Sequence, residues 1–290
     1  MMTRLSPFLP LRLLILGLAV SGVALAQSNT EKTGLQTEAA TPLPKGHLII
    51  HGGGRLTKDV VKRFAELGGG KDGHLVIVPT SGEGKISMDP KTASGWLKSL
   101  GFGKISILHT RSPKEADTRE FVEPLKDATA IWFSGGRQWR TMDVYHGTRT
   151  ADAFRGVFQR GGVIAGSSAG ATVQGSYLVR GSPEGNHVMM AKGHEAGFGF
   201  LDNVAIDQHA IKRGRLDDMI EVVQRFPKIL GIAIDEGTAL EVHGGIAKVM
   251  GESKVAFYDR AKWNDGGKKY QLLGSGERYD IANRLKLAKP

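Results

Sequence analysis

Short runs rich in valine and isoleucine alternate along this chain with stretches whose apolar residues recur every three or four positions. The apolar runs cover residues 48–50, 75–78, 105–108, 130–133 and 163–165, and the helical stretches cover residues 58–67, 91–100 and 151–159. Runs that are apolar throughout are typical of strands buried on both faces, and their alternation with amphipathic helices is typical of parallel sheets. The sequence therefore predicts an α/β fold with a mostly parallel sheet and helices on both faces.

A second alternation follows residue 203. Apolar runs at residues 204–207 and 230–234 flank a predicted helix over residues 212–224, and we expect them to extend the same sheet. Runs at residues 255–258 and 270–273 are separated by glycine-rich turns, a pattern that predicts hairpins or edge strands. We therefore expect one domain over residues 46–290, with a small antiparallel C-terminal extension.

The N-terminal part of the chain differs in composition from the rest. Arg4 and Arg12 are followed by an uncharged, mostly apolar run over residues 13–26 that ends in Ala-Leu-Ala. This run is short for a bilayer span and its small residues suit a signal peptidase, so residues 1–26 are typical of a secretory signal peptide. A retained membrane anchor is the alternative. Residues 27–45 are polar and predict a flexible linker, so we expect an exported protein, periplasmic or secreted, without stable membrane insertion once the signal is removed.

The formal net charge is +10, and removal of the predicted signal with its two arginines leaves +8. This charge favours anionic partners, but the basic residues are scattered and are not interleaved with aromatic residues, so we expect no nucleic-acid partner. The chain contains no cysteine, which excludes disulfides, thiolate metal sites and a cysteine nucleophile. We expect chemistry at an oxygen or nitrogen nucleophile without a metal or cofactor. The sequence is also compatible with a homodimer.

The fifth apolar run leads directly into Gly166-Ser167-Ser168-Ala169-Gly170, which has the form Gly-x-Ser-x-Gly. Small residues on both sides of Ser168 allow a sharp strand-to-helix turn that exposes the hydroxyl, as in a nucleophile elbow. A helix that begins near Ala169 would direct its free amides toward an oxyanion beside Ser168. The pattern predicts acyl transfer, and a glycine-rich turn that packs a helix against a sheet is the alternative.

A serine hydroxyl needs a histidine to take its proton, and that histidine works best when a carboxylate fixes its tautomer. His209 follows a predicted strand and is expected at the same sheet edge as Ser168. Another predicted strand ends in Asp235 and Glu236 at that edge. Alternation along a strand places these two acids on opposite sides, so only one can face His209. Two solvated acids in a surface turn are the alternative.

Four motifs occur in a fixed order: Gly-Gly-x-Gln at residues 135–138, Gly-x-Ser-Ala-Gly-Ala at 166–171, Asp-Gln-His at 207–209 and Gly-Ile-x-Ile-Asp-Glu at 231–236. In this order they resemble cyanophycinase and its relatives, the serine peptidase family that includes aspartyl dipeptidase (dipeptidase E). The resemblance implies a class I glutamine amidotransferase-like fold, with Ser168 as the nucleophile, His209 as the general base and Glu236 as the orienting acid. It also implies hydrolysis of cyanophycin, or of related aspartyl and isoaspartyl peptides, through an acyl-enzyme.

The resemblance assigns roles to further residues. The backbone amides of Gly136 and Ala169 would hold the oxyanion, and five side chains would contact the substrate, namely Gln138, Asp207, Gln208, Arg213 and Arg215. The two arginines suit an aspartyl peptide because a guanidinium binds a carboxylate with two hydrogen bonds. Ordinary exposed helix positions are the alternative for the arginines, and a polar helix cap is the alternative for Gln138. The sequence departs from the family pattern at Arg137, where an acid is usual, and at Asp218, where an arginine is expected, so the substrate within this class stays open.

Two other classes of function are compatible with parts of the sequence. Residues 51–54, His-Gly-Gly-Gly, imitate the oxyanion motif of lipases, so an α/β-hydrolase esterase is one alternative. That fold places the acid before the histidine, whereas here Glu236 follows His209, which argues against it. A non-catalytic binding protein on the same fold is the other alternative, and the presence of all three candidate catalytic side chains argues against it.

Overall fold

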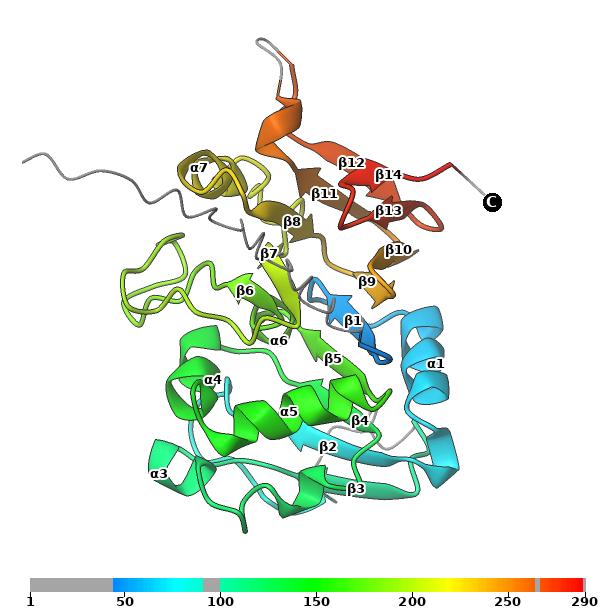
Figure 1. The fold of residues 1–290 in the computed structure, drawn as a ribbon, viewed down its shortest axis with the longest axis vertical. Coiled ribbons are helices and arrows are strands. Elements are labelled where there is room, and N and C mark those ends of the chain that lie inside the picture. The colour runs from blue at the N-terminus through cyan, green and yellow to red at the C-terminus, as the bar shows by residue number, and fades with distance from the viewer. Residues whose placement is uncertain (1–43, 91–99, 264–266, 289–290) are drawn as a thin grey trace, which may run out of the picture. The chain divides into compact units, whose positions relative to one another are not determined.

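The computed structural model describes residues 44–90, 100–263 and 267–288 (Figure 1). The predicted signal peptide and nearly all of the predicted linker lie outside the described residues, as does most of the helix predicted over residues 91–100. No helix in the described ranges is long and apolar enough to cross a membrane.

Five parallel strands form one half of a nine-stranded sheet. They are β1 (His47–His51), β2 (His74–Val78), β3 (Lys104–Ile107), β4 (Ala130–Phe133) and β5 (Val163–Ser167). The sheet order is β14-β13-β10-β9-β1-β5-β4-β2-β3, and each neighbouring pair from β1 to β3 is parallel. The strands begin and end within two residues of the predicted runs, so the predicted parallel core of the sheet is confirmed.

The other half of this sheet comes from the C-terminal part of the chain and is antiparallel. It contains β9 (Thr238–His243), β10 (Ile246–Gly251), β13 (Arg278–Asp280) and β14 (Leu285–Lys286). β9 pairs with β1 in antiparallel orientation and thereby joins the two halves. The predicted antiparallel C-terminal extension is present.

The expectation that residues 204–234 extend the first sheet is wrong. β7 (Leu201–Gln208) and β8 (Leu230–Ile234) belong to a second sheet, together with β6 (Gly175–Tyr177), β11 (Lys254–Tyr258) and β12 (Gln271–Gly274). Its order is β12-β11-β8-β7-β6, with β6, β7 and β8 parallel and β11 and β12 antiparallel. β7 and β8 cannot pair with the outer edge of β1 because β9 occupies that edge.

Helices cover both faces of the parallel strands. The helices in the described ranges are α1 (Lys58–Leu67), α3 (Pro113–Ala116), α4 (Gln138–Tyr145), α5 (Arg149–Gln159), α6 (Ala169–Thr172) and α7 (Asp218–Arg225), with short 3-10 helices at Gly70–Asp72, Glu123–Leu125 and Arg260–Lys262. Of these, α7 packs against β8 and β11 of the second sheet. α1 buries Phe64 in one core cluster with Ile49, and α5 buries Phe154 in a second cluster with Ile50. Neighbouring residues of β1 thus face different helices, as alternation along a strand requires. Figure 1 shows α1 and α5 beside these strands.

α7 begins at Asp218 and not at residue 212 as predicted. The segment before it turns, because Gly214 has φ +63°. In addition, the carboxylate of Asp235 accepts hydrogen bonds from the N–H groups of Ile211 and Lys212. These contacts keep the residues after His209 in a turn, and the helix starts only beyond it.

Candidate active site

Ser168 stands at a sharp turn between β5 and α6. Its backbone has φ 56° and ψ −114°, a conformation that residues other than glycine rarely adopt. The turn needs small neighbours, since a Cβ on Gly166 would lie 2.2 Å from the carbonyl oxygen of Gly170. A Cβ on Gly170 would in turn lie 2.0 Å from the carbonyl oxygen of Phe133. The backbone therefore has the geometry of the predicted strand-to-helix elbow.

The hydroxyl of Ser168 lies 2.9 Å from Nε2 of His209, and Nδ1 of His209 lies 2.6 Å from Oε1 of Glu236. A carboxylate only accepts hydrogen bonds, so we assign the proton of the neutral ring to Nδ1 and leave Nε2 to accept from the serine. Side chains that are 41 and 27 positions apart along the chain are thus joined by hydrogen bonds. We call these three residues the Ser168 series.

Glu236, and not Asp235, faces the histidine. Both oxygens of Asp235 are engaged elsewhere, because Oδ1 accepts from the backbone N–H groups of Ile211 and Lys212 and Oδ2 accepts from the hydroxyl of Ser253. The choice between the two acids, which alternation alone leaves open, follows from these contacts.

His209 is buried, and its surroundings favour the neutral ring. Burial lowers the pKa of His209, and the positive charges of Arg213 and Arg215 lower it further, against the opposing effect of Glu236. A neutral imidazole at pH 7 is the form that is able to accept a proton. The electrostatics therefore suit a general base.

Backbone hydrogen bonds hold the Ser168 series to the end of a single strand. The carbonyl groups of residues 51, 52 and 53 accept from the N–H groups of Ser168, His209 and Gly237, at 3.0, 2.9 and 2.9 Å respectively. Gly237 directly follows Glu236. Three consecutive carbonyls at the end of β1 thus fix the backbone beside each member of the series.

Gly53 and Gly54 leave room for the histidine and the glutamate. A Cβ on Gly53 would lie 2.2 Å from Cε1 of His209, and a Cβ on Gly54 would lie 2.8 Å from Oε2 of Glu236. Both glycines also have positive φ, 110° and 71°, which larger residues rarely adopt. The glycines that imitate a lipase oxyanion motif in the sequence therefore pack against the imidazole and the carboxylate.

The two backbone amides assigned to the oxyanion lie near Ser168. Ala169 is the first residue of α6, and a Cβ on Gly135 would lie 3.5 Å from Cβ of Ser168. Gly136 has φ 137°, and a Cβ there would lie 2.1 Å from the carbonyl oxygen of Ser81. Within the described residues neither the Gly136 nor the Ala169 N–H donates to a protein acceptor.

Three of the five side chains expected to contact substrate are buried, and Gln138 and Asp207 are firmly engaged by other residues. The amide nitrogen of Gln138 donates to the carbonyl of Val179 at 2.9 Å. The guanidinium of Arg180 donates to both carboxylate oxygens of Asp207, at 2.8 and 2.9 Å. In this conformation neither Gln138 nor Asp207 presents an unengaged side chain at the surface.

The other three side chains lie around the turn after β7. Arg213 is exposed, and its Nε lies 3.9 Å from Oε1 of Glu236. Arg215 is half-buried, and its Nη1 lies 3.5 Å from Oε1 of Gln208, which is itself buried. The structure thus places two guanidinium groups close to His209, and Arg213 is the more accessible of them.

Arg180 is a further candidate that no sequence motif marks. Its side chain is 2% exposed and binds Asp207, the Oδ2 atom of Asp218 at 2.5 Å and the carbonyl of Asn186 at 2.7 Å. A buried guanidinium is costly unless it is paired, and here it is paired with two carboxylates. Its partners lie far along the chain, so only the fold reveals the burial.

Arg137 and Asp218, the two departures from the expected family pattern, bind neighbouring parts of one loop. Arg137, at the start of α4, donates to the carbonyl of Ser182 at 2.6 Å. Asp218, at the start of α7, binds Arg180, which donates to the carbonyl of Asn186. The two departures therefore attach the loop after β6 to two helix N-termini.

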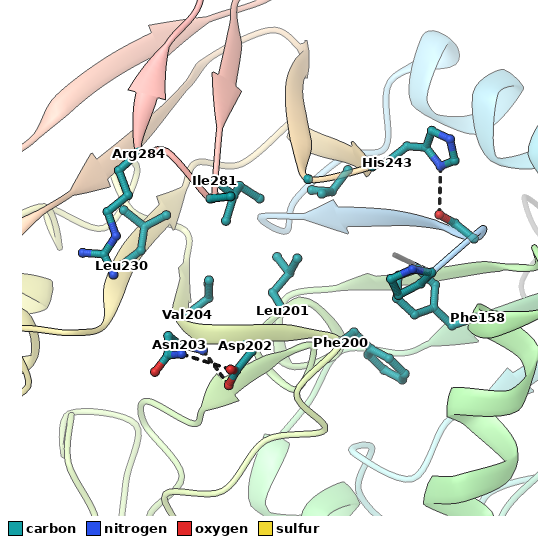
Figure 2. A pocket seen from close by; sticks show the side chains of 16 residues that line it. Phe158, Phe200, Leu201, Asp202, Asn203, Val204, Leu230, His243, Ile281 and Arg284 are labelled. Carbon is teal, nitrogen blue, oxygen red and sulfur yellow. Dashed lines mark hydrogen bonds between the residues drawn. The ribbon is translucent and has the colours of Figure 1, made fainter. Parts of the chain in front are cut away.

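A cavity of about 400 Å³ lies away from the Ser168 series (Figure 2). Its wall includes the side chains of Phe158, Phe200, Leu201, His243, Ile281 and Arg284. It lies where β1 and β7 begin, whereas Ser168 and His209 lie beyond the carboxyl ends of β5 and β7.

Among the described residues, no group of three or more metal-binding side chains could hold a metal ion.

Comparisons with known proteins identify the family of this chain. The model of peptidase family S51 matches residues 48–250. A cyanophycinase of Geminocystis herdmanii is 26% identical over 248 residues, which cover 80% of this chain and 89% of that protein. A cyanophycinase of Nostoc sp. is 27% identical over 221 residues, which cover 72% of this chain and 70% of that protein.

The crystal structure of a peptidase from an acI-B1 actinobacterium has the same fold. It superposes with a TM-score of 0.64 at 27% identity, and the match covers 82% of this chain and 98% of that chain. The family model spans both the strand end at His51 and the acid at Glu236, so it includes every member of the Ser168 series. This chain belongs to peptidase family S51 and is a serine-type peptidase.

Proposed function

We propose that Ser168, His209 and Glu236 are the catalytic triad of this peptidase. The observation that carries the proposal is the Ser168 series at a strand-to-helix elbow, with two unengaged backbone amides beside the serine. A histidine hydrogen-bonded in this way is able to take the serine proton, and preorganised amides are able to stabilise an oxyanion.

Acylation begins when Nε2 of His209 takes the proton of the Ser168 hydroxyl while Oγ attacks the carbonyl carbon of the scissile bond. The amides of Gly136 and Ala169 hold the negative oxygen of the tetrahedral intermediate. His209 then gives its proton to the leaving amine as the C–N bond breaks. Glu236 stays ionised throughout, holds the proton of Nδ1 and stabilises the imidazolium.

Deacylation repeats these steps with water as the nucleophile. His209 takes a proton from the water molecule, whose oxygen attacks the acyl carbon. The bond between that carbon and Oγ of Ser168 then breaks, and His209 returns the proton to Oγ. The products are a free carboxylic acid and the regenerated serine.

We propose that the substrates are peptides with an aspartyl or isoaspartyl residue at the cleaved bond, cyanophycin among them. The relatives named cyanophycinase support this class, at 26% and 27% identity. Arg213 and Arg215 support it as well, because they place positive charge where a substrate carboxylate would approach His209. The exposed guanidinium of Arg213 is the better placed of the two to meet it.

We also propose that the enzyme is exported, on the composition of residues 1–26. Expression of the full chain in a bacterial host, followed by cell fractionation, should place the peptidase outside the cytoplasm with Gln27 as its first residue. Recovery of a cytoplasmic protein that keeps residues 1–26 would contradict export.

The substrate proposal is tested by incubating the protein with cyanophycin and with matched α-aspartyl, β-aspartyl and alanyl dipeptides. We expect mass spectrometry to find products from at least one aspartyl substrate and none from the alanyl control. The Ser168→Ala variant, shown to be folded by circular dichroism, should give no products at all. Turnover by this variant would contradict the triad, and equal cleavage of the alanyl control would contradict the substrate class.

A further inference from the structure

His51 is a fully buried histidine that the proposed mechanism does not use. It is the last residue of β1, and its own carbonyl is one of the three that hold the Ser168 series. Its side chain lies on the neighbouring backbone and on β5: Nδ1 is 3.3 Å from the N–H nitrogen of Gly53 and 2.9 Å from the hydroxyl of Ser167. The ring therefore contacts Gly53, two residues further along the chain, and Ser167 on the neighbouring strand β5.

The contacts of His51 define the state of its ring. A backbone N–H only donates, so Nδ1 accepts from Gly53, and the proton of the neutral ring is on Nε2. The hydroxyl of Ser167 must then donate to the same Nδ1 atom. Burial lowers the pKa of His51 to about 4, so the ring stays neutral at pH 7 and Nδ1 keeps its accepting lone pair.

Both groups that the ring holds lie next to a member of the Ser168 series. Ser167 directly precedes Ser168, and the Cα atom of Gly53 lies against the imidazole of His209. The carbonyl of Gly53 accepts from Gly237, beside the glutamate. A displacement of Gly53 would therefore reach the histidine through packing and the glutamate through a hydrogen bond.

We propose that His51 is a positioning residue for catalysis: its neutral ring fixes the Gly53 amide and the Ser167 hydroxyl, and thereby the strand end that aligns the Ser168 series. The proposal rests on the triad proposed above, through which His51 acts without touching substrate. Without an acceptor at position 51, the buried N–H of Gly53 loses its partner, and the backbone must shift to find another.

Two variants of His51 separate hydrogen bonding from the filling of space. His51→Phe fills the buried site and accepts no hydrogen bond, whereas His51→Asn places a carbonyl oxygen close to the position of Nδ1. We expect His51→Phe to lower kcat, and the rate at which a fluorophosphonate labels Ser168, by about tenfold, with KM changed less than about twofold. His51→Asn should recover kcat to within about threefold of the wild type.

His74→Phe is the matched control, because His74 is also a buried histidine that accepts a serine hydrogen bond, in a different part of the sheet. It should lower the melting temperature and leave kcat unchanged. A wild-type kcat in His51→Phe would overturn the proposal. So would equal losses of kcat in folded His51→Phe and His51→Asn, since restoring a hydrogen-bond acceptor would then recover no activity.

Should His51→Phe not fold, Ser167→Ala still tests the proposal, because it removes one of the two groups that the ring holds. We expect a loss of about threefold in kcat at unchanged KM, and an unchanged kcat would overturn the proposal. Failure of the triad itself is recognised separately, by turnover in Ser168→Ala. A wild type that is labelled at Ser168 together with a fully active His51→Phe would reject only the role of His51.

Discussion

The described residues contain two series of a serine, a histidine and a carboxylate, one beyond the carboxyl ends of β5, β7 and β8 and the other on β2, β3 and the segment before β4. In the second series, which we call the Ser106 series, the hydroxyl of Ser106 lies 2.9 Å from Nε2 of His74, and Nδ1 of His74 lies 2.9 Å from Oδ1 of Asp127. Its distances resemble the 2.9 and 2.6 Å of the Ser168 series. Hydrogen-bond lengths alone therefore do not tell the two apart.

The backbone around each serine does distinguish them. Ser106 lies within β3 and pairs in regular register with Val76 of β2. Ser168 has a positive φ between a strand and a helix, and the amides of Gly136 and Ala169 are unengaged beside it. The comparison teaches that hydrogen bonds order the three side chains of each series, whereas nucleophilic catalysis also needs a serine at a sharp turn and donors for the oxyanion.

The largest difference is expected for the two histidines. His209→Ala should lower kcat about 10⁴- to 10⁶-fold, because Ser168 loses the base that takes its proton. His74→Ala should leave kcat at the wild-type value and lower only the melting temperature, since a buried ring is removed. Steady-state kinetics on the best aspartyl substrate would measure both, and a comparable loss of kcat in the two variants would remove the distinction.

The two acids should differ by a smaller factor. Glu236→Gln should reduce kcat about 10²- to 10⁴-fold, because an amide no longer favours the tautomer with the proton on Nδ1. Asp127→Asn changes an acid that is 58% exposed and should have no effect on kcat. A Glu236→Gln enzyme with wild-type kcat would show that Glu236 doesn't orient the base.

A third, smaller difference is expected in the pH dependence of kcat/KM, because a basic residue lies beside each series, Arg213 in one and Lys104 in the other. Arg213 lowers the pKa of His209, after the larger effect of burial, so Arg213→Gln should raise that pKa. Catalysis needs the neutral ring, and the acid limb of the kcat/KM profile should therefore move to higher pH. Lys104→Gln, beside Asp127, should leave the limb in place. An acid limb that stays fixed in Arg213→Gln would contradict this electrostatic coupling.

The smallest effect concerns stability in acid. Burial lowers the pKa of His74 from 6.5, so the unfolded chain binds more protons than the folded protein just below that pH. This ring therefore destabilises the folded state as pH falls below 6.5. Between about pH 7.5 and about pH 5, the melting temperature of His74→Gln should fall by less than that of the wild type. An identical loss in both proteins would show that His74 does not contribute to acid sensitivity.

Much of the fold follows from local patterns in the sequence. The strands of the parallel sheet are apolar runs. The elbow at Ser168 is built from small residues, because a larger side chain at these positions would clash with the backbone. The positions of His209 and Glu236 after predicted strands also mark them as candidates, but the expectation that they share a sheet edge with Ser168 is wrong, because β7 and β8 belong to the second sheet and β5 to the first. Each of the correctly predicted features is determined by residues close together in the sequence, so local patterns are enough to predict it.

Other features depend on contacts between distant residues. The late start of α7 depends on the carboxylate of Asp235, which holds the turn at Ile211 from 24 positions away. The separate second sheet depends on β9 pairing with β1. The burial of Arg180 beneath Asp207 has no local signal, since an isolated arginine is usually exposed. Nothing in the local sequence indicates any of these contacts.

Covalent labelling compares the two series most directly. A fluorophosphonate probe added to the folded wild type, followed by digestion and mass spectrometry, should attach one adduct to Ser168 and leave Ser106 unmodified. The adduct should persist in Ser106→Ala and disappear in Ser168→Ala. An adduct on Ser106, or its absence from Ser168 in a protein that still hydrolyses peptides, would contradict the assignment of Ser168 as the nucleophile.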